Sequence, residues 1–101
     1  MKRRIWVSVD LQAWHTDPIL GEGRHEHTWI VKAWFAADPF RDQRSLRASL
    51  SAILDAWQGR DLPPELWAAE DLAAAILQAH GNADCIGVTI ERPGFGAEAW
   101  L

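Results

Sequence analysis

Several features that define whole classes of protein are scarce or absent in this 101-residue sequence. A single cysteine, Cys85, excludes an internal disulfide and points to a reducing compartment. Lys and Arg number 10 against 14 Asp and Glu, so the net charge is −4 and no basic surface is expected to neutralise nucleic-acid phosphates. The longest apolar run, residues 72–77, is far shorter than the ~18 residues that a membrane helix needs. We therefore expect neither a nucleic-acid-binding protein nor an integral membrane protein.

The length and composition predict one globular domain over residues 1–101. Apolar residues make up 49% and charged residues 24% of the chain, and a chain this short has room for one core. The start, Met1 to Arg4, resembles that of a signal peptide. The following apolar stretch breaks at Asp10, however, and no small-residue cleavage site follows. We therefore expect a mature cytoplasmic chain.

Two segments near the start alternate with the period of a β-strand. The first segment runs from residue 5 to 15 and has apolar residues at its odd positions up to Ala13, and a second alternating segment runs from residue 25 to about 37. A loop composition, with one proline and two glycines, separates them. We expect an antiparallel hairpin whose apolar face includes Trp29 and Phe35.

The middle of the chain changes to helical periodicity. Asp38 and Pro39 suit the start of a helix over about 41–57, which buries Trp57. A second helix begins near Leu66 and ends near His80, which we expect to complement the helix dipole. Alternation returns over residues 84–91, with Ile86, Val88 and Ile90 on one face, and residues 97–101 suit a fourth strand. The order ββααββ predicts an α+β fold with both helices on one face of an antiparallel sheet. Its exposed edge strands favour pairing between subunits, so we expect a homo-oligomer.

Three histidines are the side chains best placed for chemistry. His15, His25 and His27 all occupy odd positions, so pairing of the two strands brings them to one face at one end of the hairpin. Three imidazoles with one open position are typical of catalytic zinc sites. The alternative is that His15 and His25 border a loop while His27 is a hydrogen-bonded core residue.

Ordered blocks of this sequence resemble the 6-pyruvoyl-tetrahydropterin synthase and 6-carboxy-tetrahydropterin synthase family. The blocks cover residues 11–15, 22–29, 70–73 and 88–91 and so span most of the chain. The resemblance implies the T-fold, in which ββααββ subunits join their sheets into a trimeric barrel and stack as a hexamer. It also implies that His15, His25 and His27 bind Zn²⁺.

The departures from this family concern its catalytic residues. Gly21 stands where most members have a catalytic cysteine, while Glu22 matches a subgroup with the spacing E-x-x-H-x-H. That subgroup resembles a lyase that releases 6-hydroxymethyl-dihydropterin from dihydroneopterin triphosphate. Asp55 matches the aspartate of an Asp-His pair whose histidine is Ala56 here, and Glu91-Arg92 replaces Glu-Thr. The resemblance thus implies that Glu22 and Asp55 are catalytic and that Glu91 binds the amino-pyrimidine edge of a pterin.

Two candidate functions follow from the resemblance, and a third candidate does not depend on it. The first is a zinc-dependent carbon–carbon lyase that acts on a pterin side chain, with Glu22 as the base. Its pathway is that of folate, biopterin or queuosine. The second is a non-catalytic T-fold protein that keeps the metal and the ligand pocket without turnover. The third is a small structural α+β oligomer. A phosphorylated substrate needs cations, and the candidates are Arg24, Lys32, Arg41 and Arg92.

Overall fold

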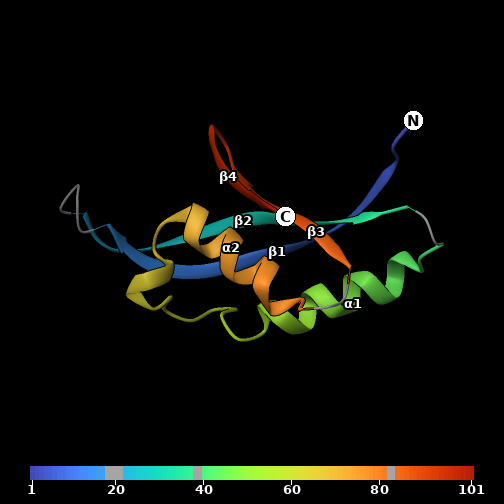
Figure 1. The fold of residues 1–101 in the computed structure, drawn as a ribbon. Coiled ribbons are helices and arrows are strands. Elements are labelled where there is room, and N and C mark those ends of the chain that lie inside the picture. The colour runs from blue at the N-terminus through green and yellow to red at the C-terminus, as the bar shows by residue number, and fades with distance from the viewer. Residues whose placement is uncertain (18–21, 38–39, 82–83) are drawn as a thin grey trace.

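Four antiparallel strands in sequential order form one sheet, and two helices cover one of its faces (Figure 1). The structure, a computed structural model, describes residues 1–17, 22–37, 40–81 and 84–101, with only the backbone of residues 17 and 22. The strands are β1 (Arg4–Asp17), β2 (Glu22–Ala36), β3 (Cys85–Arg92) and β4 (Phe95–Trp100). Between β2 and β3 lie α1 (Gln43–Leu54), a short 3-10 helix η1 (Pro64–Leu66) and α2 (Ala69–Ala79). The predicted α+β class and ββααββ order are confirmed.

The alternation of the first two strands decides which side chains enter the core. From residue 5 to 15 of β1, each odd residue pairs with an odd residue of β2, for example Leu11 with Trp29 and Val9 with Val31. Trp29, Val31 and Phe35 are buried under the helices, together with Leu11, as the pattern predicts. Helix α1 packs on β1, and α2 packs on β3 and β4. The far end of the β1–β2 hairpin extends beyond both helices (Figure 1).

The first helix is shorter than its periodicity predicts. It begins after Asp42, whose side chain accepts a hydrogen bond from the backbone N–H of Arg44, and it ends at Leu54. The expected cap at residues 38 and 39 lies outside the described residues. Trp57 follows the helix in a turn, half-buried against the core. The helix stops because the chain turns there to pair with β1, where the Gly59 N–H donates to the Gln12 carbonyl.

The second helix begins later than predicted, and the third strand buries Val88 and Ile90 as predicted but differs at Ile86. Residues 64–66 form the 3-10 turn, and α2 starts at residue 69. In β3, Phe35 pairs with Cys85 and Trp34 with Gly87, so Ile86 is an extra residue in a bulge. Cys85 therefore enters the core in place of Ile86, and the expectation for Ile86 is wrong.

The two edges of the sheet are different. Along β1, outward carbonyl groups accept hydrogen bonds from three side chains, Gln43, Arg47 and Gln58. Beyond them the backbone of residues 59–62 pairs with Gln12 and Trp14 of β1. Strand β4 is the opposite edge, and no described strand lies beyond it. None of the described helices is both long enough and apolar enough to span a bilayer.

His80 caps the end of α2 and is 7% exposed, with its ring edge against Phe35. Burial lowers its pKa, which disfavours the charged ring that the predicted interaction with the helix dipole requires. Its Nε2 atom has no hydrogen-bond partner among the described residues.

We expect the metal-free protein to lose stability as the pH falls below about 6.5, the ordinary pKa of histidine. Between pH 6.5 and the lower pKa of folded His80, the unfolded chain binds a proton at this residue more readily than the folded chain does. Protonation therefore favours unfolding in this pH range. The substitution His80→Leu should reduce this dependence and leave the part that comes from His27, whose pKa is also lowered. Urea unfolding with a chelator at pH 7.5 and pH 5.5 measures it, and equal pH dependence of the two proteins would contradict the assignment.

Candidate metal centre

The hairpin formed by β1 and β2 brings the three predicted histidines together. His15 pairs directly with His25, and His27 pairs with Ala13 two positions along. Their side chains share the helix-covered face of the sheet, with ring centroids 4.5 to 4.7 Å apart. One nitrogen from each ring lies within 4.8 Å of the other two, and all three rings are half-buried. The predicted convergence of residues 15, 25 and 27 is therefore confirmed.

Backbone carbonyl groups orient two of these rings. The Nδ1 atom of His15 lies 3.1 Å from the Trp67 carbonyl oxygen, and Nδ1 of His25 lies 2.7 Å from that of Gly23. A carbonyl accepts but cannot donate, so Nδ1 carries the hydrogen and the Nε2 lone pair is left to bind a ligand. The two Nε2 atoms lie 2.9 Å apart. Hydrogen bonds from Nδ1 to backbone carbonyl groups, as in His15 and His25, are typical of histidines that bind a metal through Nε2.

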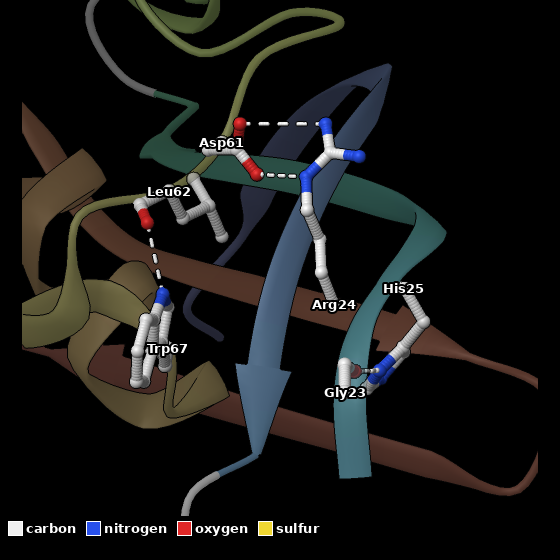
Figure 2. A network of polar contacts seen from close by, with 6 residues as sticks. All are labelled: Gly23, Arg24, His25, Asp61, Leu62 and Trp67. Atoms are coloured by element: carbon white, nitrogen blue, oxygen red, sulfur yellow. Dashed lines mark hydrogen bonds and ion pairs between the residues drawn. The ribbon is translucent and has the colours of Figure 1, made fainter.

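The segment that supplies the Trp67 carbonyl is fixed to the sheet at several points (Figure 2). The Trp67 indole N–H donates to the Leu62 carbonyl at 2.8 Å, and the Leu62 N–H donates to Trp14. Asp61 accepts two hydrogen bonds from the guanidinium of Arg24, which also lies 4.0 Å from the Trp14 ring. These contacts hold the turn before α2 against the histidine end of the hairpin.

The third histidine is neutral at physiological pH. The pKa of His27 is lowered to about 4, mainly because burial penalises the charged ring and further because of the charges of Arg92, His15 and His25. A neutral imidazole is the form that binds a metal ion, so His27 has no proton to lose near pH 7.

The donor set fits zinc. Zinc with Zn–N distances of about 2.0–2.1 Å and tetrahedral angles separates its nitrogens by about 3.3 Å. The 2.9 Å between two Nε2 atoms and the 4.8 Å limit for the whole set bracket that value. Three imidazoles also suit copper, iron and nickel. Three protein ligands with a fourth position left for water or substrate are most typical of catalytic zinc.

A cavity of about 270 Å³ lies directly beside His15. His15, Trp29, Trp67 and Arg92 contribute to its lining. Phe95 and Gly96 at the start of β4 and two small residues at the start of α2 complete it. A small cavity with aromatic walls and a few polar groups, next to potential metal ligands, is the usual form of a binding site for part of an organic molecule.

The remaining predicted site residues lie elsewhere. Glu22 begins β2, but its side chain lies outside what the structure describes. Asp55 is the exposed C-cap residue of α1, in contact with none of the three histidines among the described contacts. Glu91 is exposed on the opposite face of the sheet, with an ion pair of 3.6 Å to Lys32. The roles of Glu22, Asp55 and Glu91 stay predictions.

Sequence reasoning did not single out the Trp67 carbonyl, and it named Arg92 only as one of four candidate cations without placing it in the site. The Trp67 carbonyl has no sequence signal, because a backbone group acquires its place only through the path of the connecting turn. Arg92 had one, since alternation along β3 puts it on the same face as Ile90.

Fold and site together define a T-fold subunit with a candidate three-histidine metal centre. Among solved structures, the chain is similar to the 6-pyruvoyl tetrahydropterin synthase of Caenorhabditis elegans, with a TM-score of 0.81. The two are 16% identical, over 100% of this chain and 96% of that one, so the likeness establishes the fold. No family model matches the sequence, and no curated protein matches it.

Proposed function

We propose that this chain is a zinc-dependent T-fold enzyme that cleaves the side chain of a reduced pterin. One observation carries the proposal: three histidine rings meet on the hairpin of a fold that is shared with a pterin synthase. His15, His25 and His27 would hold Zn²⁺, with His15 and His25 fixed through their Nδ1 hydrogen bonds. When bound, the ion supplies Lewis-acid stabilisation of charge that develops on a substrate oxygen.

The reaction assigned to the site is carbon–carbon cleavage of 7,8-dihydroneopterin triphosphate. Glu22 takes the proton of the second side-chain hydroxyl, whose carbon becomes an aldehyde as its bond to the first carbon breaks. The first carbon then takes a proton back from Glu22. The products are 6-hydroxymethyl-dihydropterin and a triphosphorylated two-carbon aldehyde, so atoms and protons balance.

The sheet geometry places two further requirements on this function. Glu91, our candidate for the pterin's amino-pyrimidine edge, faces away from the histidines of its own chain, so it would serve a site completed by a second copy. Neighbouring sheets would join through β4 and the first half of β1, where side chains rather than backbone cover the edge. Asp55 at the end of α1 would act at such a junction. We propose a trimeric or hexameric barrel on these grounds.

The test is turnover. Zinc-loaded protein is incubated with dihydroneopterin triphosphate, and 6-hydroxymethyl-dihydropterin, 6-carboxy-tetrahydropterin and 6-pyruvoyl-tetrahydropterin are separated by chromatography. We expect the first product. Binding of the substrate without any product would instead establish the non-catalytic alternative, which the replacement of the family's cysteine by Gly21 and of its histidine by Ala56 favours.

A further inference from the structure

The cavity beside the histidines contains one arginine among its lining residues. Arg92 ends β3 and is half-buried. Side chains two residues apart in a strand share a face, so Arg92 lies on the same helix-covered face as buried Ile90, where the histidines also lie. The rest of the lining is aromatic, small or imidazole. A positive charge is thus placed in the space that a ligand of the metal site would occupy.

Arg92 is in a different situation from the other cations considered for substrate binding. Arg24 pairs with Asp61, Arg41 with Asp84 and Lys32 with Glu91. Arg92 forms no ion pair with any carboxylate whose side chain the structure describes. Its guanidinium lies 4.5 Å from the centroid of the Phe95 ring, which holds the group in place without neutralising it. A half-buried arginine held this way can still pair with an anion.

The charge balance of the site favours an anionic ligand. Three neutral imidazoles leave the two positive charges of a bound zinc ion uncompensated, and Arg92 adds a third. Arg92 and His15 line the same cavity, so this charge lies beside the metal ligands.

We propose that Arg92 binds an anionic group of the substrate, a phosphate or a carboxylate, in the cavity next to the metal ligands. The guanidinium can donate two parallel hydrogen bonds to either group. The site would therefore select organic anions, and Arg92 determines that specificity. This inference rests on the proposed function for the identity of the substrate, but its binding test does not need turnover.

The binding test uses inorganic phosphate and succinate as probes, with and without zinc. Calorimetry and tryptophan fluorescence measure the affinity of the protein for each probe. We expect Arg92→Met to weaken binding of at least one probe by about tenfold or more, and Arg92→Lys to restore part of it. The matched control is Arg44→Met, which removes an equal charge from an exposed position of α1. If the substitution weakens phosphate binding, the ligand group is a phosphate, and if it weakens succinate binding, the ligand group is a carboxylate. Equal binding of both probes by wild type and the folded Arg92→Met protein overturns the proposal.

A second arm separates this inference from the proposed function. With the phosphorylated and unphosphorylated forms of the pterin, Arg92→Met should raise KM for the phosphorylated form about tenfold or more and leave the other within about twofold. Equal effects on the two forms would overturn phosphate recognition by Arg92. Arg92-dependent probe binding in a protein without turnover would support the anion site while refuting the lyase.

Discussion

Replacing His27 by alanine is expected to weaken zinc binding about 100-fold or more. Each ligand of a protein zinc site contributes about 3 kcal/mol to binding, which corresponds to that factor in Kd. His27 is neutral near pH 7 because its pKa is lowered to about 4, so its loss removes a ready ligand. Calorimetric titration with zinc, and metal analysis of dialysed protein, should give one ion for each wild-type chain and little for the variant.

The control for this result is His80→Leu. His80 is a buried histidine at the end of α2 and is not part of the three-histidine group. It should keep wild-type zinc affinity although its stability changes. His27→Gln, which preserves the size of the side chain, guards against an unfolded alanine variant. Wild-type zinc affinity in both His27 variants would contradict the assignment of this residue.

Replacing Glu22 by glutamine is expected to lower kcat by 10²–10⁴-fold, the usual contribution of a general base, while zinc binding stays unchanged. Glutamine keeps the shape of the side chain but cannot accept the hydroxyl proton. Steady-state formation of 6-hydroxymethyl-dihydropterin measures this effect, and metal analysis of the same samples shows that the site is still loaded.

Glu26→Gln provides the matched control. Glu26 lies between two of the histidines in sequence, but it is exposed on the opposite face of the sheet, where it accepts a hydrogen bond from Gln12. Its substitution should change kcat less than about twofold. Full turnover by Glu22→Gln would remove Glu22 from the mechanism and leave the metal site unaffected.

The arrangement of the histidines could be predicted because a strand offers only two faces. His15, His25 and His27 share the parity of Leu11 and Trp29, so burial of that apolar set carries the histidines to the same face in any register that preserves it. The order of the elements followed in the same way from the change of periodicity along the chain.

The details that the sequence did not predict depend on choices between nearly equivalent residues or on backbone position. Cys85 and Ile86 are neighbouring apolar residues on opposite parities, so only the bulge decides which of them is buried. Asp42 and Asp38 are both good N-caps, and the packing of α1 on β1 is consistent with the later start. The carbonyl that orients His15 comes from a connecting turn, where no side-chain pattern predicts its direction.

X-ray absorption at the zinc edge of the purified, zinc-loaded protein tests the central claim most directly. The account predicts three imidazole nitrogens at about 2.0–2.1 Å, together with a fourth, oxygen ligand from solvent or substrate. The imidazole signal should fall to two rings in His27→Gln. A spectrum with sulfur from Cys85, or with one histidine or none, would show that the three rings of the hairpin do not form the metal centre.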